Sequence, residues 1–294
     1  MATFTDQPAG PLFRSSSHAA MTGAPMGQLT FCSESCSESD GYEQFMGRWS
    51  RRLAPPFVRF ASVDEADLVL DVGCGTGALS VAAAAIPFTH VTGVDRSTAY
   101  ISRAENEPGG RRIRFEVGDA AALRFRDATF DRTISLLMLN HLPDPAAGLR
   151  EMIRVTRPGG IVAAAIWDYG QGMEMLRIFW DEAAALDPTI GAHDQRRTPL
   201  SRRGKLTALW QAHALQDVKE QPLTIDLDFS SFDDFWQPVL NGRRPAGVYA
   251  ASLSEPARRA LQSRLRDRLL NGRHDGSFTL RARAWAVRGV VPAA

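Results

Sequence analysis

Short hydrophobic runs alternate with longer amphipathic stretches through the first half of the chain. The run 69–72 is mainly apolar and β-branched, which predicts a buried strand. Three closely spaced glycines follow it, and the alanine-rich stretch 78–86 predicts the beginning of a buried helix. Strands alternating with helices imply right-handed crossovers, so the pattern predicts an α/β fold with a doubly wound parallel sheet. Four further strands are predicted over 90–94, 113–117, 130–139 and 161–167.

Helix signals precede the first of these strands and fill the gaps between the others. Residues 42–60 place hydrophobic side chains at spacings of three, four and seven, which is typical of an amphipathic helix. Ser97 is a predicted N-cap after the second strand, and Asp144 followed by Pro145 predicts the beginning of another helix. The sequence Arg-Pro-Gly-Gly at 157–160 should end that helix.

The alternation stops after Asp168. Residues 169–213 are mixed in polarity and predict a helical insertion that forms a lid, and residues 230–272 predict a second helical insertion. Extended patterns at 215–229 and 277–290 predict two closing strands.

The beginning of the chain differs in composition from everything that follows. Residues 1–40 are rich in Ser, Gly, Pro, Ala and Thr and approach low complexity around Cys32 and Cys36, so they predict a disordered tail. The expected organisation is this tail followed by one domain over 41–294, whose cofactor-binding core covers 42–168.

Composition excludes several classes of function. The chain has 294 residues, 44% of them hydrophobic, and a formal net charge of +1, which offers no electrostatic reason to expect a nucleic-acid partner. Three cysteines without ligand-spaced histidines argue against a disulfide framework or a metal site. The absence of a long apolar run argues against a membrane helix, and no secretory signal is visible, so the expected location is the cytoplasm.

Two acids follow predicted strands at the edge of the sheet where the glycine turn lies. Asp95 ends the second strand, where a carboxylate can accept hydrogen bonds from both hydroxyls of a ribose. Asp119 follows the third strand and could accept from an amino group of a base, although alone it could equally cap a turn at 120–123. The glycines would let the backbone approach a ligand, next to the N–H groups at the helix N-terminus. Arg48 would lie near a ligand carboxylate if the 42–60 helix covers the pocket.

Together these segments resemble the motif series of class I S-adenosylmethionine-dependent methyltransferases. The similarity is greatest to the small-molecule branch that includes quinone-biosynthesis enzymes (methyltransferase type 11). It covers residues 42–168 and implies a Rossmann-like sheet of seven strands whose last strand is antiparallel. It also implies S-adenosylmethionine as cofactor and a small-molecule acceptor. The matching segments are 69–77, Val94-Asp95, Gly118-Asp119-Ala120, Phe130-Asp131 and 157–160.

The resemblance also implies roles for individual residues. Asp71 would fix the glycine turn and approach the amino group of the cofactor through water, and Asp95 would hold the ribose. The glycines would line the methionine part, and Asp119 with the Ala120 backbone would meet the adenine. The remaining expected cofactor contacts are Arg48, Gly73, Cys74, Gly75, Gly77, Arg96 and Leu139. The segment 139–141 would face the methyl group, which makes His141 the candidate general base; its competing role is a loop histidine bonded to backbone.

Two other functions remain open at this point. The turn satisfies G-x-G-x-x-A over 73–78, so a nicotinamide or flavin oxidoreductase is an alternative. A protein that binds S-adenosylmethionine without turnover is another. For an enzyme, the material above the sheet edge predicts an apolar or aromatic acceptor pocket. The residues expected to supply it are Trp49, Met173, Met175, Phe179, Trp180, Phe232, Phe235, Trp236 and Tyr249.

Overall fold

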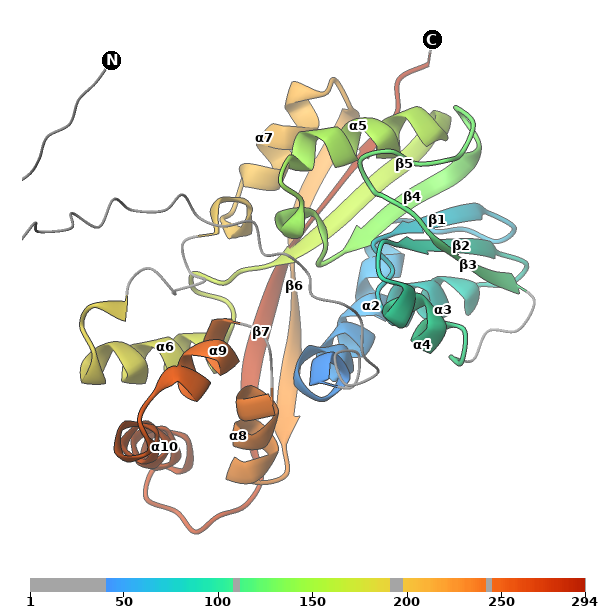
Figure 1. Cartoon of the computed structure of the whole chain (residues 1–294). Coiled ribbons are helices and arrows are strands. Elements are labelled where there is room, and N and C mark those ends of the chain that lie inside the picture. Colours follow the sequence, from blue (N-terminus) through green and yellow to red (C-terminus); the bar gives the residue numbers. More distant parts are fainter. Residues whose placement is uncertain (1–40, 108–111, 191–197, 242–244, 294) are drawn as a thin grey trace, which may run out of the picture. The chain divides into compact units, whose positions relative to one another are not determined.

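The computed structural model describes residues 41–107, 112–190, 198–241 and 245–293. The tail expected over 1–40 lies outside the described residues. Seven strands form one sheet in the order β3-β2-β1-β4-β5-β7-β6 (Figure 1). The strands are β1 (Leu68–Val72), β2 (His90–Asp95), β3 (Ile113–Val117), β4 (Phe130–Leu136), β5 (Thr156–Trp167), β6 (Gln216–Phe229) and β7 (Phe278–Val290).

The first five strands are parallel, as their alternation with helices predicts. The last strand in the chain, β7, lies between β5 and β6 and is antiparallel to both. The expected doubly wound, seven-stranded sheet with an antiparallel last strand is therefore confirmed. The carboxyl ends of β1, β2, β4 and β5 meet along one edge, where a ligand site of this fold is expected.

Helices surround this sheet, and several of their boundaries follow from local signals. The side chain of Ser97 accepts from the Tyr100 N–H, and that of Asp144 accepts from the Ala146 N–H, so both predicted N-caps are confirmed. The helical elements are η1 (Glu43–Gly47), α2 (Arg48–Phe60), α3 (Ala78–Ala84), α4 (Thr98–Ala104), η3 (Leu139–His141), α5 (Pro145–Val155), α6 (Glu174–Leu186), η6 (Pro199–Ser201), α7 (Lys205–Ala212), α8 (Phe232–Asn241), α9 (Pro245–Ser252) and α10 (Glu255–Leu270).

The two faces of the sheet have separate hydrophobic cores, because side chains on a strand alternate between faces. On β5, Val162 and Ile166 pack in the cluster that contains residues of α5 and α7. Ala163 and Trp167 pack on the opposite face, in the larger cluster with α2, α3, α6, α8, α9 and α10. Figure 1 shows α5 and α7 on one side of the strands and α2 and α3 on the other.

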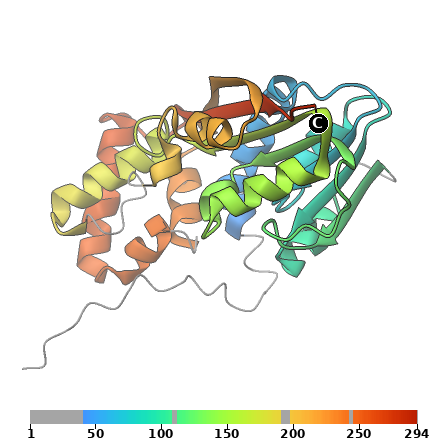
Figure 2. The same ribbon diagram turned by 90° about the horizontal axis from the view of Figure 1, so that it is seen from above.

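The helices after β5 divide into two groups by what they pack against. Helix α7 packs on the sheet: Trp210 is fully buried, and its Nε1–H donates to the Val162 carbonyl at 3.0 Å. Helices α6, α8, α9 and α10 instead contact one another beside the β6–β7 pair (Figures 1 and 2). Within the described part of the predicted insertion at 169–213, α6 packs with the other C-terminal helices and α7 packs on the sheet; α9 was not predicted.

Two strand boundaries also differ from the prediction. Strand β4 ends at Leu136 rather than residue 139, because Leu137 has a positive φ of 64°, which interrupts the extended backbone. Strand β5 begins at Thr156, since Phe130 pairs with Thr156 and the register then shifts before Arg132 pairs with Ile161. The Arg-Pro-Gly-Gly sequence ends α5 as expected, but it forms an irregular part of the strand.

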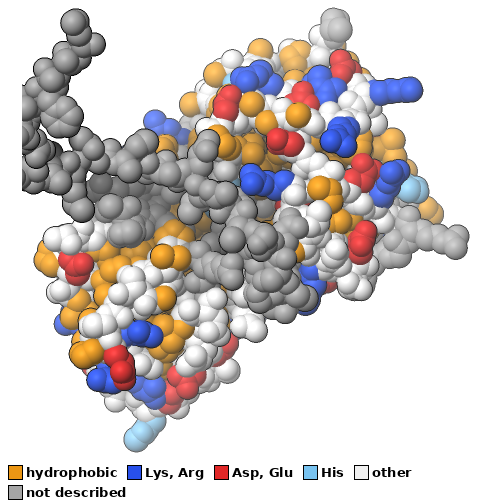
Figure 3. All heavy atoms as spheres, viewed as in Figure 1, with side chains coloured by type: hydrophobic (Ala, Val, Ile, Leu, Met, Phe, Trp, Pro, Cys, Tyr) orange, Lys and Arg blue, Asp and Glu red, His pale blue; other side chains and the backbone are white. Residues whose placement is uncertain are grey.

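The surface has mixed charge. On the face seen in Figure 3, Lys and Arg side chains are scattered among Asp and Glu side chains, as a net charge near zero suggests. Over the described residues, no helix has the length and apolarity that crossing a membrane would require. The same part of the chain contains no group of His, Cys, Asp and Glu arranged to hold a metal ion.

Candidate functional site

The glycine turn after β1 has a backbone that only glycine adopts easily. Gly73 and Gly75 have φ values of +75° and +53°. A Cβ on Gly73 would lie 2.2 Å from Cγ of Met138, so the missing side chain makes room for Met138. A Cβ on Gly75 would meet no described atom within 4 Å. Gly75 therefore leaves open space at the point where the backbone could approach a ligand.

Asp95 holds this turn in place. One carboxylate oxygen, Oδ2, accepts from the Gly75 N–H at 3.0 Å, and the other, Oδ1, accepts from the Ser97 N–H at 2.9 Å. Burial raises the pKa of Asp95 above 3.8, against the opposing effect of these backbone hydrogen bonds and of the neighbouring Arg96 charge. Each carboxylate oxygen can accept a second hydrogen bond, so the group can also bind hydroxyls.

Asp71 lies beneath the same turn and is fully buried. Its Oδ2 accepts from the Ser80 hydroxyl at 2.7 Å, while its Oδ1 has no partner among the described residues. Burial, with a further contribution from the charge of Asp95, raises the pKa of Asp71 to about 7. A carboxylate oxygen that is buried without a donor is costly, and a cationic ligand nearby would favour its ionised form.

The predicted helix over 42–60 covers the turn as two consecutive elements, η1 and α2. Glu43 accepts from the Thr76 hydroxyl of the turn and also pairs with Arg51. The Tyr42 ring lies 5.6 Å from the Tyr100 ring at the beginning of α4. Side-chain contacts therefore link this segment, which we call the cap, to the glycine turn and to α4.

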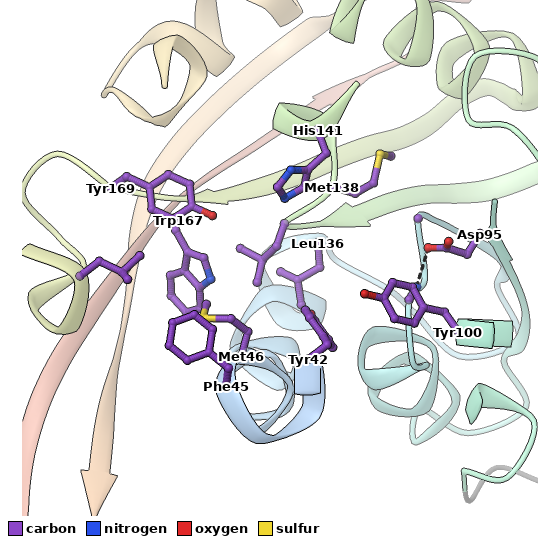
Figure 4. A pocket seen from close by; sticks show the side chains of 14 residues that line it. Tyr42, Phe45, Met46, Asp95, Tyr100, Leu136, Met138, His141, Trp167 and Tyr169 are labelled. Atoms are coloured by element: carbon purple, nitrogen blue, oxygen red, sulfur yellow. Dashed lines mark hydrogen bonds between the residues drawn. The ribbon is translucent and has the colours of Figure 1, made fainter. Parts of the chain in front are cut away.

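A pocket lies between this cap and the carboxyl ends of β1, β2, β4 and β5 (Figure 4). Its wall is mainly hydrophobic and aromatic, and Asp95 is the one carboxylate among the described lining residues, which include no Lys or Arg. The lining residues are Tyr42, Phe45, Met46, Gly73, Gly75, Asp95, Tyr100, Leu136, Leu137, Met138, His141, Trp167, Tyr169 and Leu176.

Four of the residues expected from the sequence meet in this pocket: Gly73, Gly75, Asp95 and His141. The His141 ring points into the pocket in Figure 4, and its Nε2 lies 3.4 Å from the Asn140 amide nitrogen. The expected neighbours Cys74, Gly77 and Leu139 do not line it. Burial raises the pKa of the Cys74 thiol, which disfavours its reactive thiolate form.

Gly77 and Leu139 serve packing instead. A Cβ on Gly77 would lie 3.2 Å from the Phe115 ring and 3.3 Å from the Ala104 Cβ, so this glycine allows α3 to approach β3 and α4. Leu139 is buried in the cluster on the α5 face. The neighbouring residues Leu137 and Met138 line the pocket in its place.

Arg48 lies away from the pocket. Its guanidinium donates to Asp234 Oδ1 at 2.7 Å and lies 4.2 Å from the centre of the Trp49 ring. This ion pair links α2 and α8. The expected contact between Arg48 and a ligand carboxylate stays a prediction. Asp119 and Arg96 are exposed on the loops after β3 and β2, and Asp119 Oδ1 accepts from the Ala121 N–H at 2.9 Å. Ala120 packs against the α5-side cluster.

The sequence predicted an apolar pocket wall, but the prediction of which residues form that wall is wrong. All nine are buried, yet none of them lines the pocket. Phe179 and Trp180, for example, pack edge to face 5.1 Å apart inside the C-terminal helices. The side chains that do form the wall on this side are Trp167 and Tyr169, at and just after the carboxyl end of β5. Their position after a strand end was the signal that could have found them.

Comparisons with known proteins find similar sequences for the first half of the domain and a similar fold for most of the chain. The family model described as a methyltransferase domain matches residues 70–164. The 2-methyl-6-phytyl-1,4-hydroquinone methyltransferase of Synechocystis is 38% identical over 115 residues, which cover 39% of this chain and 36% of that protein. The 27-O-demethylrifamycin SV methyltransferase of Amycolatopsis mediterranei is 37% identical over 101 residues, 33% of this chain and 37% of its own length. The aligned region thus spans little more than a third of these two relatives.

A solved structure extends the likeness in fold beyond the matched region. The Haemonchus contortus phosphoethanolamine N-methyltransferase 2, in complex with phosphomonomethylethanolamine and S-adenosylhomocysteine, has a TM-score of 0.53 and 20% identity. The likeness covers 88% of this chain and 58% of that chain. The sheet order and the acid beside a glycine turn are those of a Rossmann-like fold. Residues 70–164 match a methyltransferase domain, and the two relatives named above are methyltransferases.

The described residues fit S-adenosylmethionine on two structural grounds. The open space above Gly75 can take a ligand against the backbone, next to a carboxylate with acceptor capacity for ribose hydroxyls. The partnerless Oδ1 of Asp71 would gain a donor from an ammonium group through water. The arrangement therefore provides one acceptor in the pocket, at Asp95, and a second one beneath the glycine turn, at Asp71.

Proposed function

We propose that this protein transfers a methyl group from S-adenosylmethionine to a small, uncharged and mainly apolar organic acceptor. The proposal rests on one pocket whose lining has two chemically different parts. Gly73, Gly75 and Asp95 form one part of it, and aromatic and aliphatic side chains form most of the rest. A cofactor held at the first part would face an acceptor held at the second.

The cofactor supplies a methyl group that is already activated as a sulfonium, so the main task of the protein is alignment, worth up to about 7–11 kcal/mol in favourable systems. In this proposal Asp95 accepts hydrogen bonds from the ribose hydroxyls, and Asp71 binds the amino group of the cofactor through water. The open backbone at Gly75 lets the ligand lie against the turn. Arg96, Asp119 and Ala120, on the loops after β2 and β3, are the proposed neighbours of the adenine.

The character of the acceptor follows from the charges in the wall. No cationic side chain stands among the described lining residues, so a phosphate or carboxylate on the acceptor would lose its hydration without gaining a partner. A mainly apolar molecule would instead bury its surface against Met46, Leu136 and Trp167. The relatives named for a hydroquinone and for a rifamycin as their substrates support this class of acceptor.

His141 is the proposed general base because its ring faces the pocket from the loop after β4. A base is needed where the reacting oxygen or carbon of the acceptor carries a proton, and such a group contributes typically about 10²–10⁴-fold in rate. The competing role of His141 is structural, through the contact with the neighbouring Asn140.

Calorimetric titration tests the cofactor assignment. We expect S-adenosylmethionine and its demethylated product to bind and NADH not to bind. The reverse result would favour an oxidoreductase. A screen of uncharged aromatic acceptors with isotope-labelled methyl donor then separates an enzyme from a non-catalytic binder, because only an enzyme yields labelled acceptor.

A further inference from the structure

The indole of Trp167 presents an unused hydrogen-bond donor at the acceptor pocket. Trp167 is the last residue of β5 and is 1% exposed. Its Nε1–H is buried and has no partner among the described residues. Figure 4 shows the indole among the pocket side chains, with its nitrogen on the edge of the ring that is turned toward the pocket.

The backbone fixes this orientation. The Cα atoms of Trp167 and Ala284 are partners across the β5–β7 ladder, so the ring is carried by a paired strand and not by a loop. The alternation along β5 places the ring on the face that α2 and η1 cover, where Met46 is buried beside the pocket. A donor that is fixed in this way can select a ligand atom by position.

A partnerless indole alone would mean little in this protein. Trp49 and Trp180 also have buried Nε1–H groups without partners, but neither lines the pocket. Trp210 has the satisfied arrangement, with its Nε1–H bonded to the Val162 carbonyl at 3.0 Å. Trp167 differs from all three because its residue lines the pocket, with the nitrogen on the edge of the ring turned toward it.

Resting on the proposed function, we infer that Trp167 selects the acceptor by donating a hydrogen bond from Nε1–H to an oxygen of that molecule. A buried donor without a partner is costly, and a ligand oxygen would remove that cost on binding. Since the described lining contains no Lys or Arg, the oxygen belongs to a neutral carbonyl or hydroxyl and not to a carboxylate or phosphate. The acceptor class is thus an uncharged ring compound of the phenol, quinol or aryl ketone type. Trp167 acts in specificity, and no proton transfer is asked of it.

The test compares ring compounds that differ only in the oxygen. The probes are α-tetralone and β-naphthol, with the hydrocarbons tetralin and naphthalene as matched partners, all added to the full chain saturated with S-adenosylhomocysteine. Two-dimensional proton–nitrogen NMR of the isotope-labelled protein follows the indole N–H signals. We expect the oxygenated probes to move the Trp167 signal downfield and the hydrocarbons not to do so. The signals of Trp180 and Trp210 should stay in place.

Affinity gives the second readout. Trp167→Phe keeps an aromatic ring and removes the donor, so it should weaken binding of the oxygenated probes by about fivefold relative to the hydrocarbons, the factor for one neutral hydrogen bond. Trp180→Phe, which removes an equally buried donor outside the pocket, should leave all affinities unchanged. Should Trp167→Phe not fold, the NMR comparison on the wild-type protein still decides, with the Trp167 signal assigned by elimination through single Phe variants at the other tryptophans.

Three results would overturn the inference. They are an unmoved Trp167 signal, an equal loss of affinity for oxygenated and hydrocarbon probes in Trp167→Phe, and no binding of any of the four probes by protein that binds S-adenosylhomocysteine. Calorimetry on the same samples keeps the two proposals apart. Failure to bind S-adenosylhomocysteine or S-adenosylmethionine refutes the proposed function itself, whereas cofactor binding with a silent Trp167 refutes only its role in specificity.

Discussion

Replacing Asp95 with alanine removes the one carboxylate among the described residues that line the pocket. In the structure this carboxylate accepts hydrogen bonds from the Gly75 N–H at 3.0 Å and from the Ser97 N–H at 2.9 Å. In the proposed complex its remaining acceptor capacity goes to ribose hydroxyls. Asp95→Ala should therefore weaken cofactor binding in two ways, by losing the ribose bonds and by loosening the glycine turn.

The size of the loss can be worked from one bond. A hydrogen bond to a charged group is worth about 1.5–3 kcal/mol, which corresponds to about a 10- to 150-fold change in Kd. The Gly75 and Ser97 N–H groups are only partly buried, so water can replace much of what the fold loses. We therefore expect at least about a tenfold rise in the Kd for S-adenosylmethionine, with a smaller effect on folding, about 1 kcal/mol.

Titration calorimetry measures the affinity, and thermal unfolding shows that the variant is folded. Asp187→Ala is a matched control, because Asp187 also accepts a backbone N–H two residues ahead, that of Thr189 at 2.9 Å, but lies outside the pocket. The control should bind the cofactor as the wild type does. If Asp95→Ala binds within twofold of the wild type, or if Asp187→Ala loses as much affinity, the assignment of Asp95 is refuted.

Three further predictions concern neighbouring residues. His141→Gln should slow methyl transfer to an acceptor found by the labelled screen by at least about 10²-fold while leaving cofactor affinity unchanged, and a loss below tenfold would show that His141 is not the base. The pKa of Asp71 is raised from 3.8 to about 7 in the folded protein, which therefore keeps this proton to a higher pH than the unfolded chain does. Stability should thus fall as the pH rises through that window, by at most about 1.4 kcal/mol per pH unit, and urea titrations should show a flatter profile for Asp71→Asn. Gly73→Ala should lower the free energy of unfolding by about 1–3 kcal/mol, because it combines a left-handed φ with a collision with Met138. Gly75→Ala shares the left-handed φ but meets no described atom, so it should cost less stability and should also weaken cofactor binding; equal melting temperatures for the two variants would contradict this.

The sequence alone was sufficient for the sheet and for the meeting of Gly73, Gly75 and Asp95 at one edge of it. Hydrophobic runs of strand length that alternate with helical periodicity imply parallel strands, and the carboxyl ends of parallel strands share one edge. Gly73, Gly75 and Asp95 each lie within three residues of such an end, so their meeting needed no knowledge of packing. Strand length, helical periodicity and distance from a strand end depend only on residues that are close together in the sequence. They can therefore be recognised before the tertiary structure is known.

The part of the pocket proposed for the acceptor was decided by the tertiary structure. Periodicity shows that Trp49, Trp180 and Trp167 are each buried, but it does not show what they are buried against. The Arg48 guanidinium lies over the Trp49 ring and forms an ion pair with Asp234, 186 residues further along the chain. Trp180 packs among the C-terminal helices, and Trp167 alone of the three lies at the pocket. Because burial can be satisfied by a neighbouring element as well as by a cavity, only the packing of distant segments determines which aromatic side chains remain for a ligand.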